Sequence, residues 1–138
     1  MLSPILAVED INASIKFYVD VLGFTENWKM QDEHQRTNFA CVRMGDAEIL
    51  LGVIEGFVDP ADLAQRGIGI QLYLEVPENI AIDTLYERAI SAARITREIE
   101  TRNWGERTFS VRDPDGYQLM LAQRITAVDP AVNGHASA

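Results

Sequence analysis

The spacing of apolar and polar residues changes several times along the chain, and each change predicts a new element. A short apolar run at Ile5–Val8 predicts a strand. Apolar residues then recur at helical spacing as far as Val21, with Asp10 as the N-cap and Gly23 as the terminating residue. Three strand-like runs follow, at Thr25–Met30, Asn38–Met44 and Ala47–Val53. The first half therefore predicts the order βαβββ.

The same order returns in the second half. Pro60–Gln65, with Asp59 as its cap, predicts a short helical linker. A strand, a helix and three strands then follow, at Ile70–Val76, Ile80–Ala93, Arg94–Glu100, Thr108–Arg112 and Tyr117–Gln123. We expect a single domain over 1–125, with modules at about 1–56 and 68–125, a linker at 57–67 and a flexible tail at 126–138.

Self-similarity between the halves indicates a duplication. An offset of 68 places Leu6 on Leu74 and Tyr18 on Tyr86. An offset of 70 places Phe39 on Phe109, Ile49 on Leu119 and Leu51 on Leu121. A fixed-period repeat takes priority over local assignments. The prediction is an α+β fold of two βαβββ modules with mixed sheets; a ferredoxin-like arrangement is the alternative, which the extra strand in each half disfavours.

Composition narrows the class of protein. With 138 residues, 47% of them hydrophobic and 24% charged, the chain matches an ordinary soluble domain. No apolar run approaches the roughly 18 residues that span a bilayer. The single cysteine, Cys41, lies in an apolar segment and is expected to be buried, which favours a cytoplasmic protein. A net charge of −9 argues against nucleic-acid binding; it suits either a cationic ligand or solubility alone.

Motifs at both ends of the domain resemble one family. They are Leu6-Ala7-Val8-Glu9-Asp10-Ile11, Phe17-Tyr18, Val21-Leu22-Gly23-Phe24, Trp104-Gly105 and Arg112-Asp113-Pro114-Asp115-Gly116-Tyr117. With the repeat, they resemble the glyoxalase/bleomycin resistance/dioxygenase (vicinal oxygen chelate) superfamily. The resemblance implies cupped sheets and a homodimer, sometimes with exchange of an N-terminal strand.

The resemblance also implies where a metal site belongs. The family's ligand positions fall on Ser3, Leu50, Gln71 and Met120. Leu50 has no donor atom, and a thioether is a poor ligand for Mg, Mn or Zn. We therefore expect no metal, no cofactor and no catalytic residue. His34, in a polar turn, and His135, in the tail, are expected to be surface residues.

Metal-lacking members of the superfamily include bleomycin-resistance proteins, which sequester a large cationic, aromatic drug. The chain resembles them in Pro4, in Tyr73 and in the loop 103–107, but has Asn103 where a proline is usual. A ligand-binding cup is expected to be lined by Asn38, Phe39, Leu50, Gln71, Tyr73, Trp104 and Met120. Trp104 either stacks on a planar ligand or fixes its loop, and Trp28 is expected to be structural.

Three functions remain open from the sequence. The favoured one is metal-free binding of a small molecule, with antibiotic or metabolite sequestration as its purpose. The alternative is a glyoxalase-family enzyme, a lyase, isomerase or dioxygenase, with an atypical or absent metal site. The third is an interaction module with a vestigial pocket. The expected partners are a cationic aromatic molecule and a second copy of the chain, with neither nucleic acid nor membrane.

Overall fold

The computed structural model describes residues 1–125 and contains two βαβββ modules, each with a four-stranded mixed sheet. The tail predicted at 126–138 lies outside the described residues. The strands of the first module are β1 (Ile5–Val8), β2 (Thr25–Gln31), β3 (Thr37–Met44) and β4 (Ala47–Val53). Those of the second are β5 (Gln71–Glu75), β6 (Arg94–Thr101), β7 (Glu106–Arg112) and β8 (Gln118–Arg124). The expected α+β fold is confirmed.

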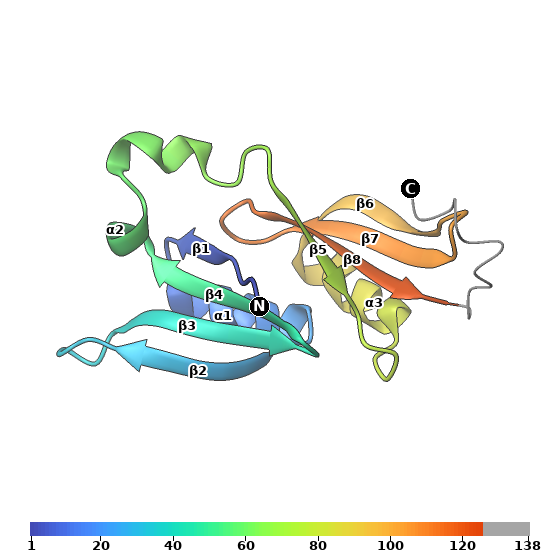
Figure 1. The fold of residues 1–138 in the computed structure, drawn as a ribbon, viewed down its shortest axis with the longest axis horizontal. Coiled ribbons are helices and arrows are strands. Elements are labelled where there is room, and N and C mark those ends of the chain that lie inside the picture. The colour runs from blue at the N-terminus through green and yellow to red at the C-terminus, as the bar shows by residue number, and fades with distance from the viewer. Residues whose placement is uncertain (126–138) are drawn as a thin grey trace.

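The two sheets share one topology. Their strand orders are β1-β4-β3-β2 and β5-β8-β7-β6, with the first strand of each module parallel to the last and the other pairs antiparallel. The first two strands of each module therefore lie at opposite edges of its sheet, and the helical segment between them crosses from one edge to the other. Figure 1 shows the sheets side by side, with the linker arching from one to the other.

The first helical segment begins and ends at local sequence signals. The Asp10 carboxylate caps α1 (Ile11–Lys16) by accepting from the Ala13 N–H at 3.1 Å. The wider turn η1 (Phe17–Val21) continues α1, and Gly23, with a φ of 80°, ends the segment as predicted.

The second module's helix is α3 (Ile82–Ala92). The linker holds the 3₁₀ helix η2 (Pro60–Gln65), capped by Asp59 as predicted. A short helix that was not predicted, α2 (Ile54–Phe57), directly follows β4. Within the described residues, none of the helices has the length and apolarity needed to cross a membrane.

One face of each sheet packs against the helices to form the hydrophobic core. Leu6 and Leu51 of the first sheet are buried there, as are Leu74, Phe109 and Leu121 of the second. The alternating residues point away from the helices, because successive side chains on a strand point to opposite sides. We call the surface that they form the outer face of each sheet.

Strand register tests the repeat directly and corrects one part of it. Ile5 pairs with Leu50 as Tyr73 pairs with Met120, which confirms the offsets in the first and last strands of the modules. Phe109, however, pairs with Leu121, and the corresponding partner of Leu51 is Ala40. Ala40, not Phe39, is therefore equivalent to Phe109, and the predicted match was wrong.

The hairpin length explains the error. The connection from Arg112 to Gln118 is one residue longer than the equivalent connection from Arg43 to Glu48. A one-residue slip exchanges the two faces of a strand. Phe109 is consequently buried in the core, and Phe39 lies on the outer face.

Candidate ligand-binding site

The predicted site residues fall into two groups on two outer faces. Phe39 and Leu50 lie on the first sheet, and Gln71, Tyr73 and Met120 lie on the second. Asn38 has no partner in the ladder and lies at the irregularity between Thr37 and Phe39, so strand pairing does not place it on the face of Phe39. Trp104 lies in the β6–β7 loop, near Glu106, and both Trp104 and Tyr73 donate hydrogen bonds to the Glu106 carboxylate. We find no hydrogen bond or ring contact between the two groups in the described part of the chain.

The outer face of the first sheet is apolar and aromatic, and we call it the apolar face. Its apolar members, from the strand pairing, are Ile5, Trp28, Met30, Phe39, Cys41, Leu50 and Gly52. The paired residues Arg43 and Glu48 lie on the same side of the sheet, at the end beside the β3–β4 hairpin. The Phe39 ring lies 5.5 Å from that of Trp28 and 5.4 Å from that of Phe57, with which it is stacked. Trp28, expected to be structural, therefore packs on a predicted site residue.

Phe57 is a member that the sequence did not suggest. The short helix α2 lays its ring over Gly52, where a Cβ would lie 2.3 Å from a ring atom. Only glycine leaves room for that approach. A glycine inside a strand was the one available signal, since it often marks close approach by another group.

The outer face of the second sheet is polar, and we call it the polar face. Its members are Gln71, Tyr73, Glu75, Arg94, Arg97, Ser110, Arg112, Gln118 and Met120. At one end, the Glu106 carboxylate accepts two hydrogen bonds: from the Trp104 indole N–H at 2.8 Å and from the Tyr73 hydroxyl. One carboxylate thus fixes two partly exposed aromatic side chains.

This end of the polar face is strongly acidic. A cavity of about 740 Å³ is bordered by four carboxylates and one guanidinium, contributed by Asp46, Glu75, Glu78, Glu106 and Arg124. Partial burial, the hydrogen bond to Glu106 and the nearby negative charges raise the pKa of the Tyr73 phenol, so it stays protonated and donates to Glu106. Part of the negative net charge of the chain is therefore concentrated around this cavity.

The residues at the family's metal positions do not fit a metal. Leu50 stands between Ile5 and Cys41 in the ladder, and Met120 stands between Tyr73 and Ser110. Neither offers an oxygen or nitrogen donor. In residues 1–125 no group of three or more His, Cys, Asp or Glu is arranged to hold an ion. His34 is exposed beside Glu33, and His135 lies outside the described residues.

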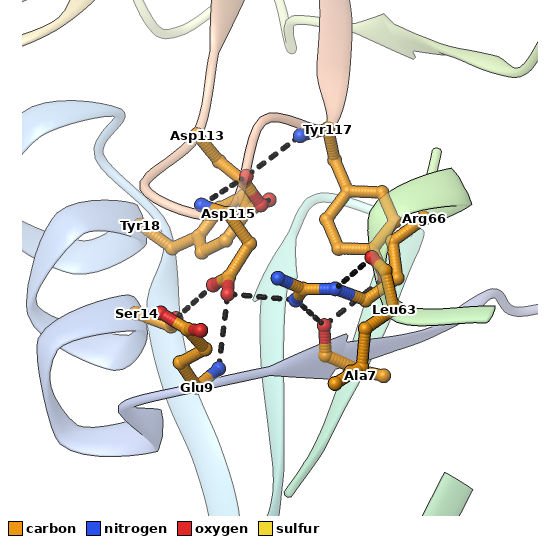
Figure 2. Close-up of polar contacts among 9 residues, drawn as sticks. All are labelled: Ala7, Glu9, Ser14, Tyr18, Leu63, Arg66, Asp113, Asp115 and Tyr117. Atoms are coloured by element: carbon orange, nitrogen blue, oxygen red, sulfur yellow. Dashed lines mark hydrogen bonds and ion pairs between the residues drawn. The ribbon is translucent and has the colours of Figure 1, made fainter. Parts of the chain in front are cut away.

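A polar network that the sequence did not reveal joins the linker to both modules (Figure 2). The Asp115 carboxylate accepts from the Arg66 guanidinium at 2.9 Å, from the Glu9 N–H at 2.9 Å and from the Ser14 hydroxyl at 3.3 Å. Arg66 also donates to the Ala7 carbonyl at 2.8 Å. The β7–β8 hairpin, which holds Asp115, is thus one of the contacts between the modules.

A second carboxylate in that hairpin is buried. Asp113 accepts from the Tyr18 hydroxyl at 2.7 Å and from the N–H groups of Asp115 and Tyr117. Burial raises the pKa of both Asp113 and Tyr18. Because its acceptors are occupied by the protein, we interpret this network as structural.

Comparison with known proteins agrees with this architecture. The family model described as "Glyoxalase/Bleomycin resistance protein/Dioxygenase superfamily" matches residues 2–121. The uncharacterized protein YwbC of Bacillus subtilis is 32% identical over 124 residues, covering 86% of this chain and 93% of its own. A superfamily member from Sphaerobacter thermophilus has a TM-score of 0.64 at 27% identity, covering 88% of this chain and 94% of its own.

The bleomycin-binding protein of Streptomyces verticillus, solved with copper(II)-bleomycin, has a TM-score of 0.59 at 24% identity, covering 93% of this chain and 95% of its own. It is one of several comparable neighbours, so the expected special closeness to bleomycin-resistance proteins is not established. The family itself is shown by the matched model, the repeat and the fold. The chain belongs to the glyoxalase/bleomycin resistance protein/dioxygenase superfamily.

Proposed function

We propose that the chain binds a small planar molecule that carries a positive charge, and that it sequesters this antibiotic or metabolite without a metal. The observation that carries the proposal is the pair of hydrogen bonds from Tyr73 and Trp104 to Glu106. Aromatic faces attract cations, and a carboxylate beside them adds charge complementarity. The acidic cavity next to Tyr73 supports the same ligand class.

The alternative is a glyoxalase-family enzyme with an atypical or absent metal site. A metal-dependent enzyme of this kind needs donor atoms that Leu50 and Met120 lack. A ligand for the folded state raises the melting temperature by mass action. We expect no saturable shift with micromolar Ni, Zn, Mn or Fe; such a shift with any of them would support the enzyme.

The direct test compares two probes of the same shape and opposite charge, 9-aminoacridine and acridine-9-carboxylate. We expect 9-aminoacridine to bind more tightly to the Tyr73 end, to quench tryptophan emission and to raise the melting temperature. Salt should weaken its binding, because part of the attraction is electrostatic. Equal affinities that do not respond to salt would contradict the proposed ligand class.

Glu106→Gln sharpens the test, because it removes the charge and keeps an amide oxygen as an acceptor. We expect the preference for the cation to fall by about tenfold, the loss of one charge-assisted contact. The matched control is Glu98→Gln, which neutralises an exposed carboxylate on β6 outside the cavity. An equal loss in both variants would show that net charge alone sets the preference.

A further inference from the structure

The end of the polar face opposite Glu106 carries positive and amide side chains. Strand pairing places Gln71 beside Gln118, Gln118 beside Arg112, and Arg112 beside Arg94. These four side chains therefore form one row across the sheet. Arg112 is half-buried, and no carboxylate pairs with it in the described part of the chain.

The first module shows how the equivalent arginine is neutralised. Arg43 is equivalent to Arg112, and both donate to a glycine carbonyl in the following hairpin: Gly45 at 3.0 Å and Gly116 at 2.7 Å. Arg43 pairs directly with Glu48 across the strands, and their charged groups lie 3.6 Å apart. In the second module, the residue equivalent to Glu48 is Gln118. The arginine is retained, and its counter-charge is replaced by a neutral amide.

A cavity opens at this uncompensated charge. Its volume is about 450 Å³, and the residues that border it are Arg66, Gly67, Ile68, Gly69, Ile70, Gln71, Arg112, Gly116 and Gln118. None of these bordering residues is acidic. Arg66 is already paired with Asp115, so the available charge belongs to Arg112. Gly67 and Gly69, both with positive φ, border the cavity with backbone that carries no side chain.

We propose that this cavity is a binding subsite for an oxyanion, the carboxylate or phosphate group of a ligand. A planar guanidinium suits either group, because it donates parallel hydrogen bonds to two oxygens. The amides of Gln71 and Gln118 add neutral donors beside it. The subsite does not depend on the acidic cavity at the other end of β5, because Glu75 lies four residues, or about 13 Å, further along the strand.

The experiment titrates ¹⁵N-labelled protein with benzoate and, separately, with phenyl phosphate at constant ionic strength. The amide signals of Gly67, Gly69, Gln71 and Gln118 report on the cavity. We expect saturable shifts at low millimolar concentration with at least one probe, and the probe that saturates identifies a carboxylate or a phosphate as the group bound. No saturable shift with either probe would overturn the proposal.

Two variants test whether the unpaired charge of Arg112 is responsible for oxyanion binding. Arg112→Gln removes the charge, and Gln118→Glu keeps Arg112 but restores the carboxylate found in the first module. We expect each to weaken oxyanion binding by about tenfold or more, as the loss of a charge-assisted hydrogen bond implies. Arg43→Gln is the matched control and should leave binding unchanged. Unaltered affinity in both test variants, with melting temperatures near that of the wild type, would refute the assignment.

Discussion

The two modules have nearly the same backbone fold, but the outer faces of their sheets differ in chemical character. On the helix side, Leu6 and Leu74 are equivalent and buried, as are Leu51 and Leu121. On the outer side, Trp28 of the apolar face is equivalent to Arg97 of the polar face. The core tolerates few changes because its side chains interlock. The outer faces do not pack against α1 or α3, so they are the surfaces on which the duplicated halves have acquired different chemistry.

This contrast shows where binding energy is available in the fold. The apolar face brings the rings of Trp28, Phe39 and Phe57 together, and it supplies contact area for a ligand or a second copy of the chain. The polar face holds acidic groups at the Glu106 end, whereas its other end has an arginine that faces a neutral amide. The apolar face can contribute affinity through buried contact area, and the charged groups of the polar face can contribute selectivity between ligands.

The largest effect is expected on stability, from removing the ion pair that joins the linker to the second module. Asp115→Ala leaves the Arg66 guanidinium without its carboxylate, in a site where the side chains of Arg66 and Asp115 are 14% and 4% exposed. Removing one partner of a buried ion pair costs roughly 3 to 5 kcal/mol. We expect a loss of that size in the free energy of unfolding, measured by urea denaturation. Asp62→Ala, at an exposed linker position, is the control; similar small losses in both would contradict the structural role of Asp115.

The second prediction concerns the oligomeric state, because both outer faces expose large apolar side chains. Ile5, Met30 and Tyr73 are 49%, 56% and 52% exposed. We expect a homodimer that covers them and buries on the order of 2,000 Å² in total. Light scattering at tens of micromolar should give twice the chain mass. A monomeric mass would mean that the faces are open to solvent and ligand alone.

Local signals explain what the sequence predicted and what it missed. Asp10, Asp59 and Gly23 act on neighbouring residues, so the caps and ends of the helical segments followed from the chain itself. The contact of Phe57 with Gly52 and that of Arg66 with Asp115 depend on segments that meet only after folding.

The candidate site was predicted in the same uneven way. Tyr73 and Trp104 were identified through motifs, and the structure places both on Glu106, a residue that no pattern singled out. The residues expected around one cup lie on two sheets. Which face a strand residue occupies depends on register, and a single extra hairpin residue was enough to misplace the equivalence of Phe39.

A smaller effect, on the affinity for 9-aminoacridine, distinguishes binding at Trp104 from binding at Trp28. Trp104→Ala should weaken 9-aminoacridine binding by about five- to thirtyfold, since a lost stacking contact costs roughly 1 to 2 kcal/mol. Most of the fluorescence quenching should disappear with it, because Trp28 is the chain's other tryptophan and lies on the other sheet. The matched variant is Trp28→Ala. If Trp28→Ala removes the quenching and Trp104→Ala does not, the aromatic ligand binds on the apolar face.

The weakest response should come from giving the first module the charge pattern of the second. Glu48→Gln leaves Arg43 opposite a neutral amide, as Arg112 is opposite Gln118. The Arg43 side chain is 44% exposed, and pairs of this kind contribute at most about 1 kcal/mol, so we expect little change in the melting temperature. In this variant, benzoate or phenyl phosphate should shift the amide signals of Arg43 and Gly45 only weakly, because the glycine-containing wall at 67–69 belongs to the cavity at Arg112. Binding as tight as at Arg112 would show that an arginine opposite an amide is sufficient and that the glycine loop contributes nothing.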